Sequence, residues 1–298
     1  MPSPLVATLI SNPSMPAISA DLARSAAAAV KADGVSWLAD AIACDLHLPD
    51  SMDARKAETL LREILAQHPV DIAVQQTASR RKKALIADMD STMINQECID
   101  ELAAEAGFGE KVAEITARAM NGEIAFEPAL RERVALLKGL PLAIVDKVLR
   151  ERITLASGGS ELVATMRANG AWTALVSGGF TLFTGPVAAM LRFDENRANI
   201  LHHENGILSG TVAEPILGKQ AKIDALQAVA RARNLTPHDF IAVGDGANDL
   251  GMLDLAGTGI ALHAKPSVAA QAKIRIDHGD LTALLYVQGY HQGDFARI

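Results

Sequence analysis

The stretch that decides the fold is Ala84-Leu85-Ile86-Ala87-Asp88-Met89-Asp90-Ser91-Thr92. Four consecutive apolar residues are typical of a strand in a parallel sheet that is covered on both faces. Asp88 and Asp90 follow this strand directly, so both should lie at its carboxyl end, where open α/β sheets bind their ligands. Two carboxylates this close resist joint ionisation unless a cation lies among them. Taken alone, however, the stretch also fits an ordinary acidic turn.

A second acidic cluster follows another apolar strand. Ile241-Ala242-Val243 leads into Gly244-Asp245-Gly246-Ala247-Asn248-Asp249. Carboxylates that converge from separate strand ends, with water and a phosphate oxygen, supply the oxygen ligands that Mg²⁺ requires. The two clusters therefore predict a magnesium site formed by the side chains of Asp88 and Asp245 and the backbone carbonyl of Asp90.

A phosphate-binding segment lies between the two clusters. Val176-Ser177-Gly178-Gly179-Phe180 ends a third apolar strand, and its glycines let backbone N–H groups approach a phosphate while Ser177 donates its hydroxyl. Lys222, near the start of a predicted helix, could neutralise the nucleophile and the phosphoryl group. The chain lacks the Gly-Lys-Ser/Thr of a nucleotide P-loop and the Rossmann glycine spacing, which disfavours NTP or NAD binding.

Four residues, in this order and each at its expected structural place, resemble the four motifs of the haloacid dehalogenase superfamily: Asp88, Ser177, Lys222 and Asp245. The resemblance implies an α/β fold, with a Rossmann-like parallel sheet and a helical cap insertion. It also implies that Asp88 forms an aspartyl-phosphate and that Asp90 acts as general acid and then as base. Ser177, Gly178 and Lys222 would bind the phosphoryl group.

Two segments more specifically resemble the phosphoserine phosphatases of this superfamily. They are Asp88–Glu97 (DMDSTMINQE) and Phe126–Lys138 (FEPALRERVALLK). By this resemblance Glu97 would pair with the ammonium group of the substrate and Arg133 with its carboxylate. The remaining assignments are apolar cap contacts from Met120 and Phe126, a substrate or phosphate contact from Asn248, and orientation of the metal's water shell by Asp249.

The implied reaction is the Mg²⁺-dependent hydrolysis of O-phospho-L-serine, the last step of serine biosynthesis. Other small phosphomonoesters, such as phosphothreonine or phosphohomoserine, are the alternative substrates. A sugar phosphate would leave Glu97 and Arg133 unpaired, which is costly in a closed site. A further alternative is an amino-acid-binding regulator with an inactive catalytic domain, against which the intact pair Asp88 and Asp90 argues.

The first eighty residues predict a small α+β domain. Strands are expected at 5–10 and 71–75, helices at 19–31 and 54–67, and an extended hairpin at 36–48, which is compatible with a ferredoxin-like βαββαβ order although no glycine turn marks the hairpin. The domain resembles the ACT-like extension of some bacterial phosphoserine phosphatases, which implies a homodimer through this domain. We therefore expect an ACT-like domain at 1–79 and a catalytic domain at 80–298, with the cap inserted at 107–154.

Composition excludes several other classes. The net charge of -7 argues against a nucleic-acid-binding surface, and apolar residues at 49% with aromatics at 4% indicate an aliphatic α/β interior. The two cysteines, Cys44 and Cys98, have neither disulfide-framework nor zinc-site spacing. With no apolar run of about 18 residues and no export signal, we expect no membrane partner and a cytoplasmic protein.

Overall fold

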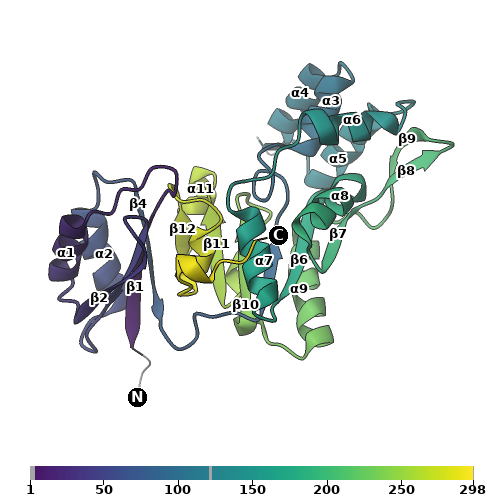
Figure 1. Cartoon of the computed structure of the whole chain (residues 1–298). Coiled ribbons are helices and arrows are strands. Elements are labelled where there is room, and N and C mark those ends of the chain that lie inside the picture. Colours follow the sequence, from purple (N-terminus) through teal and green to yellow (C-terminus); the bar gives the residue numbers. More distant parts are fainter. Residues whose placement is uncertain (1–3, 121–122, 298) are drawn as a thin grey trace.

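The amino-terminal part of the chain forms a four-stranded antiparallel sheet in the order β2-β3-β1-β4. The structure is a computed structural model that describes residues 4–120 and 123–297. The elements follow the predicted βαββαβ order: β1 (Leu5–Ser11), α1 (Ala20–Ala29), β2 (Gly34–Ala39), β3 (Ala43–His47), α2 (Ala54–Ile64) and β4 (Val70–Gln76). The two helices lie together on one side of the sheet (Figure 1).

The β2–β3 hairpin turns without a glycine. Ala41 adopts the left-handed backbone conformation, with φ at 54°, which costs a non-glycine residue about 1 kcal/mol. Hydrogen bonds from other parts of the domain hold this turn: the Ile18 N–H donates to the Ala41 carbonyl and the Ser11 N–H to the Ile42 carbonyl. Because tertiary contacts support the turn, no local signal marks it in the sequence.

The catalytic part contains a six-stranded parallel sheet in the order β12-β11-β10-β5-β6-β7. Its strands are β5 (Ala84–Ala87), β6 (Trp172–Phe180), β7 (Glu195–Asn199), β10 (Phe240–Gly244), β11 (Thr258–Leu262) and β12 (Ile274–Ile276). Short, mainly apolar runs at 84–88, 171–176, 240–244, 259–262 and 274–276 predict five of them. They miss β7, because the residues ENRAN of this edge strand carry no apolar run.

Helices cover both faces of the sheet, as its apolar strands predict. Leu85 and Ala87 of β5 face one hydrophobic cluster, whereas Ala84 and Ile86 face another. The first cluster includes α7 (Gly159–Ala168), α8 (Thr181–Leu191) and α12 (Ala283–Val287), and the second includes α9 (Lys219–Arg233), α10 (Leu250–Leu255) and α11 (Pro266–Ala269). Two short 3₁₀ helices, η1 (Pro237–Asp239) and η2 (Gln292–Asp294), complete this part.

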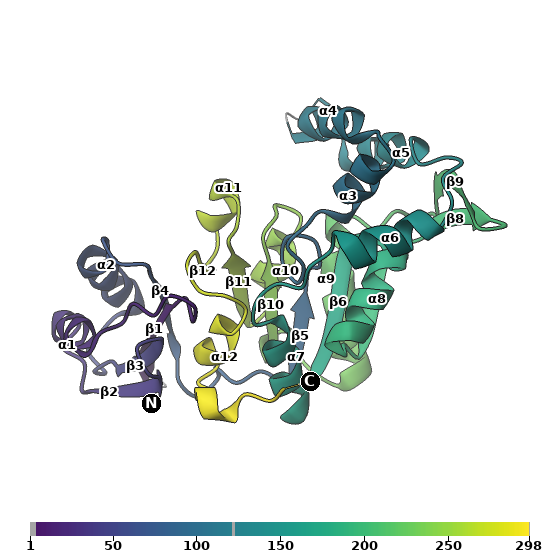
Figure 2. The ribbon, with the colours of Figure 1, turned by 45° about the horizontal axis from the view of Figure 1, so that its top comes forward.

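A helical cap follows β5. Its helices α3 (Cys98–Glu105), α4 (Gly109–Met120), α5 (Phe126–Ala135) and α6 (Ala143–Glu151) lie together above the sheet (Figure 2). The cap was expected at 107–154, but α3 packs against α4 and α6, so the helical unit begins at Cys98 in the structure.

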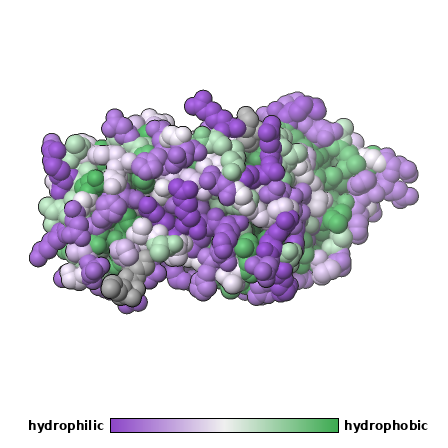
Figure 3. Space-filling view, turned by 60° about the horizontal axis from the view of Figure 1, so that its bottom comes forward, coloured by the Kyte–Doolittle hydropathy of each residue, from purple (hydrophilic) through white to green (hydrophobic). Residues whose placement is uncertain are grey.

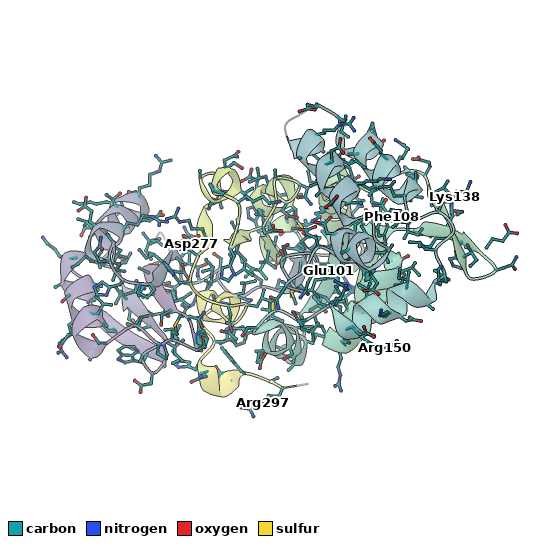
Figure 4. All side chains as sticks on the ribbon, turned by 90° about the horizontal axis from the view of Figure 1, so that it is seen from above. Glu101, Phe108, Lys138, Arg150, Asp277 and Arg297 are labelled. Atoms are coloured by element: carbon teal, nitrogen blue, oxygen red, sulfur yellow. The ribbon has the colours of Figure 1, made fainter. Side chains whose placement is uncertain are left out.

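A β-hairpin from the catalytic part binds to the cap. The hairpin-like segment GILSG at 206–210 predicts a small insertion at 199–212. Strands β8 (Leu201–Glu204) and β9 (Ile207–Val212) lie in this segment. The Gly139 N–H donates to the Leu208 carbonyl at 2.9 Å, and the Leu208 N–H donates to the Leu140 carbonyl at 2.8 Å. Lys138, which precedes Gly139, lies beside this hairpin in Figure 4. Backbone hydrogen bonds thus join the hairpin to the cap.

On the face shown in Figure 3, charged and polar residues predominate, and hydrophobic residues form groups among them. Among the described residues, no helix is long and apolar enough to cross a membrane.

One buried carboxylate fastens the amino-terminal domain to the catalytic sheet. Asp71 on β4 accepts hydrogen bonds from the N–H groups of Asp277, His278 and Gly279, at 2.7, 3.1 and 2.7 Å. These three residues follow β12, and Figure 4 places Asp277 between the two parts of the chain. The Gly279 carbonyl in turn accepts a hydrogen bond from the His263 ring at 2.7 Å. Because unpaired buried polar groups are costly, these bonds set the relative position of the two parts.

We expect Asp71→Asn to lower the free energy of unfolding by about 2 kcal/mol, because an amide NH₂ would face donors that now share a carboxylate. Urea denaturation followed by tryptophan fluorescence measures the change, since Trp37 lies in β2 and Trp172 in β6. The exposed Asp50 provides the control variant Asp50→Asn. Equal stability of the two variants would show that the Asp71 contacts do not hold the domains together.

Candidate active site

Three neighbouring strands bring the predicted motifs to one edge of the sheet. In the sheet β5 lies between β10 and β6, and Asp88, Asp245 and Ser177 follow or end these strands. Because all three strands are parallel, their carboxyl ends meet at the same edge. All three side chains are buried.

Three carboxylates form a buried cluster at this edge. Asp88, Asp245 and Asp249 each offer one carboxylate oxygen, and these oxygens lie within 4.8 Å of one another. The ammonium group of Lys222, on α9, forms an ion pair with Asp88 at 2.5 Å and another with Asp249. Burial disfavours this ammonium, but Asp88 and Asp249 outweigh burial and raise the pKa of Lys222, so it remains protonated.

The cluster fits a divalent cation. Burial raises the pKa of Asp88 well above its usual value, with Asp249 and Asp90 adding to the effect and Lys222 opposing it. Burial likewise raises the pKa of Asp245, and Asp249 adds to it. Raised pKa values mean that ionising all three carboxylates beside a single lysine is unfavourable without a further cation, and carboxylate oxygens are the donor type that Mg²⁺ prefers.

Asp249 is part of the same cluster. Its carboxylate is one of the three that converge, and its predicted role of orienting the water shell of a metal stays a prediction. The same carboxylate binds Lys222 and accepts the Gly246 N–H at 2.9 Å, so it also shapes the loop after β10. The Asp90 carboxylate is not part of this cluster, and a metal contact through its backbone carbonyl stays a prediction.

Asp90 is oriented by the phosphate-binding loop and by the start of the cap. Its carboxylate accepts the Cys98 N–H at 2.8 Å and the Ser177 hydroxyl at 3.0 Å. The Ser177 oxygen also accepts the Gly179 N–H at 2.8 Å. A Cβ atom on Gly179 would lie 2.9 Å from an Asp90 oxygen and 3.0 Å from the Ser177 oxygen, so a larger residue here would displace these two side chains.

Phe126 extends from the cap toward the catalytic part. A Cβ atom on Gly178 would lie 3.6 Å from the Phe126 ring, and one on Gly218 would lie 3.4 Å from it. The phenylalanine is 42% exposed, so it does not belong to the cap's own core. Its ring therefore borders the phosphate-binding loop and the start of α9.

Charged residues from two cap helices face a common region. Glu97, at the N-cap of α3, accepts the Ser91 hydroxyl at 2.9 Å, and burial together with the nearby Asp90 raises the pKa of Glu97 to about 7. Arg133 on α5 is half-buried; burial lowers its pKa, whereas Asp100 and Glu97 raise it. The structure thus places the negative Glu97 and the positive Arg133 within electrostatic reach of each other.

Three residues near the site were missed from the sequence. Ser91, with φ at 55°, orients Glu97, and a non-glycine residue in this backbone region often marks a functional site. Burial raises the pKa of Asp100, whereas Arg133 lowers it. The Lys265 N–H donates to the Asp245 carbonyl at 3.3 Å. Two signals in the sequence could have located them. Asp100 lies one helical turn after Glu97, and Lys265 follows shortly after β11.

Two predicted residues add little to this geometry. Asn248 is exposed on the loop after β10, where its side chain lies close to Gly246. Met120 is the last residue of α4, and its side chain lies outside the described part of the structure.

Comparisons with known proteins agree with this arrangement. Residues 85–254 match the family model of haloacid dehalogenase-like hydrolases. A phosphoserine phosphatase of Haemophilus influenzae is 45% identical over 218 residues, which cover 72% of this chain and 69% of that protein.

Two solved structures are similar to the fold. A crystal structure of a haloacid dehalogenase family hydrolase from Salmonella enterica serovar Typhi covers 95% of this chain and 98% of its own, with a TM-score of 0.86 and 29% identity. A phospho-aspartyl intermediate analogue of phosphoserine phosphatase has a TM-score of 0.64 and 41% identity, and covers 69% of this chain and 98% of its own. On the matched motifs, the site geometry and these similarities, the chain belongs to the haloacid dehalogenase-like hydrolase family.

Proposed function

We propose that this enzyme hydrolyses O-phospho-L-serine to L-serine and phosphate through a phosphorylated Asp88, the last step of serine biosynthesis. The observation that carries the proposal is the buried contact of Asp88 with Lys222, beside an Asp90 carboxylate that the Ser177 hydroxyl orients. The related enzyme of H. influenzae has the same named activity. The catalytic unit is proposed to span residues 80–298, with the cap between β5 and β6.

The first half-reaction forms the covalent intermediate. An Asp88 carboxylate oxygen attacks phosphorus while the bond from phosphorus to the serine oxygen breaks. Asp90 gives its proton to the departing serine oxygen. The hydrogen bonds that Asp90 accepts from the Ser177 hydroxyl and the Cys98 N–H hold its carboxyl group in place for this step. Lys222 and the N–H groups around Gly178 balance the charge of the phosphoryl oxygens.

The second half-reaction regenerates the enzyme. Asp90, now ionised, accepts a proton from water as the water oxygen attacks phosphorus, and the bond to Asp88 breaks to release phosphate. Bound Mg²⁺, held by Asp88 and Asp245, would supply further positive charge beside the phosphoryl oxygens. The phosphoryl group therefore meets positive charge on more than one side.

The cap selects the substrate. Glu97 and Arg133 match the ammonium and carboxylate groups of an amino acid, and a bound ammonium would favour the ionised form of Glu97. Phe126 borders the phosphate-binding loop and limits the space beside it. A phosphomonoester that lacks either charged group would leave Glu97 or Arg133 without its partner.

A phosphate-release assay tests the activity. We expect the highest catalytic efficiency with phosphoserine among phosphoserine, phosphothreonine, phosphohomoserine, a sugar phosphate and a nucleotide, with loss of turnover in excess chelator and recovery on added Mg²⁺. Asp88→Asn should abolish turnover, and a beryllofluoride adduct should form on Asp88 of the wild type. The related variant Asp254→Asn, on the exposed side of α10, should remain active. Full activity in chelator, or an adduct on another carboxylate, would contradict the proposal.

We expect Glu97→Ala and Arg133→Ala to lower kcat/KM for phosphoserine about 30- to 1000-fold, because each leaves a substrate charge unpaired at a cost of about 2–4 kcal/mol. The weak activity toward p-nitrophenyl phosphate should change little, since that compound has neither charged group. Arg118→Ala, which removes an ion pair with Glu132 on the cap, is the matched control. Similar losses with both substrates would mean that the two residues support the fold or the phosphoryl step.

We propose that the amino-terminal domain forms a homodimer through strand β2. In the described sheet β2 pairs only with β3, so its other edge is free for pairing with a second strand, and Trp37 on it is 36% exposed. Antiparallel pairing with β2 of a second copy would satisfy a two-fold axis. The ACT-like character of the domain, which the sequence predicted, is part of this proposal.

Sedimentation velocity tests the dimer. Trp37→Glu should shift the protein to a monomer, because two like charges would meet near the axis, whereas Met15→Glu, at an exposed residue of the loop after β1, should leave the dimer intact. A monomeric wild type at all concentrations would exclude this interface.

A cytoplasmic location is part of the proposal. Cys44 and Cys98 are buried free thiols, as expected in a reducing compartment.

A further inference from the structure

Asn199, the last residue of the edge strand β7, is almost fully buried with 2% exposure. Its amide nitrogen donates to the Gly178 carbonyl at 2.9 Å and to the Leu217 carbonyl at 3.2 Å. Its amide oxygen accepts the Leu217 N–H at 2.7 Å. Both donor hydrogens and the acceptor are therefore used, and all partners are backbone groups.

These partners belong to two segments that contact the phosphoryl group in the proposed reaction. Gly178 lies in the phosphate-binding loop next to Ser177, and Leu217 precedes Gly218, the N-cap of α9, which carries Lys222. Asn199 thus connects the loop that donates N–H groups to the helix that provides the ammonium. No motif of the sequence pointed to this link.

Regular strand pairing does not provide the link. The pairing of β6 with β7 shifts between Val176 and Phe180, so the phosphate-binding loop leaves the ladder where Gly178 lies. A side chain reaching back from Asn199 replaces the missing ladder contact. This explains why a buried amide lies at the end of an otherwise polar edge strand.

Packing holds only one side of this segment: Ile216 is buried in a hydrophobic cluster, whereas Leu217 is partly exposed. Leu217 borders a cavity of about 280 Å³ that Val176, Arg197 and Ala221 also line. On its other side Gly218 faces the Phe126 ring of the cap. Leu217 itself has no such packing on the cavity side, and both of its backbone hydrogen-bonding groups are held by Asn199.

We infer that Asn199 is a positioning residue that holds the phosphate-binding loop and the start of α9 at a fixed separation. The inference rests on the proposed function in one respect, that the ligand between these segments is a phosphoryl group. Groups that bind such a ligand must be placed to within a fraction of an ångström to act together. Loss of the amide should weaken phosphoryl binding with every substrate, independently of the amino-acid part.

The test compares Asn199→Ala and Asn199→Asp with the wild type. We expect the dissociation constant of inorganic phosphate, measured by calorimetry in Mg²⁺, to rise about tenfold or more in both variants, because two or three hydrogen bonds are lost. Asn199→Asp retains the acceptor for the Leu217 N–H but places a carboxylate against two carbonyl oxygens. The KM values of phosphoserine and p-nitrophenyl phosphate should rise by similar factors.

Asn196→Ala is the matched control. Asn196 lies on the same strand and accepts the Thr184 hydroxyl at 2.9 Å. This hydrogen bond involves neither Gly178 nor Leu217. It should lower the melting temperature without changing phosphate affinity. If the alanine variant of Asn199 does not fold, the nearly isosteric aspartate variant provides the measurement.

Unchanged phosphate affinity in a folded Asn199 variant, even with a lower melting temperature, would overturn the inference. A larger loss with phosphoserine than with p-nitrophenyl phosphate would also overturn it, because the effect would then lie in amino-acid recognition. Weakened phosphate binding in an enzyme whose wild type fails the substrate panel would support the positioning role while refuting the proposed function.

Discussion

The buried contact of Lys222 with Asp88 and Asp249 is the interaction on which the site depends. Charges this deep are costly unless they are paired, so the end of β5, the loop after β10 and helix α9 must come together for the fold to be stable. The same pairing leaves the carboxylates in excess, which prepares the cluster for a cation. Stability and chemistry therefore impose the same geometry on these three segments, and the phosphate-binding loop and the cap are arranged around it.

Much of this arrangement could be predicted because its signals are local. Apolar strands followed at once by polar residues located Asp88, Ser177 and Asp245, and the parallel sheet then required them to meet. The resemblance to a known family located Lys222, a residue that by itself would be read as a solvated lysine. The βαββαβ order of the amino-terminal domain was predicted in the same way, from alternating short segments of strand and helix character.

The remainder was hidden because it depends on tertiary contacts. Strand β7 reads as a polar loop, and Asn199 within it becomes meaningful only beside Leu217, 18 residues further along the chain. Ala41 turns without glycine because Ile18 supports it, and α3 belongs to the cap because it packs on α4 and α6. Phe126 could have filled the interior of the cap; only its exposure and its proximity to Gly178 and Gly218 decide otherwise.

The position of the amino-terminal domain also has a consequence for aggregation. Strand β12 is the edge of the catalytic sheet, and such an edge presents unpaired backbone groups to other molecules. Here β4 lies beside β12, and Asp71 occupies the N–H groups that follow it (Figure 1). The phosphoserine phosphatase structure described above is matched over 98% of its own length but covers only 69% of this chain, so part of this chain has no counterpart in it. In this chain, the small domain covers one sheet edge that would otherwise be open to edge-to-edge association.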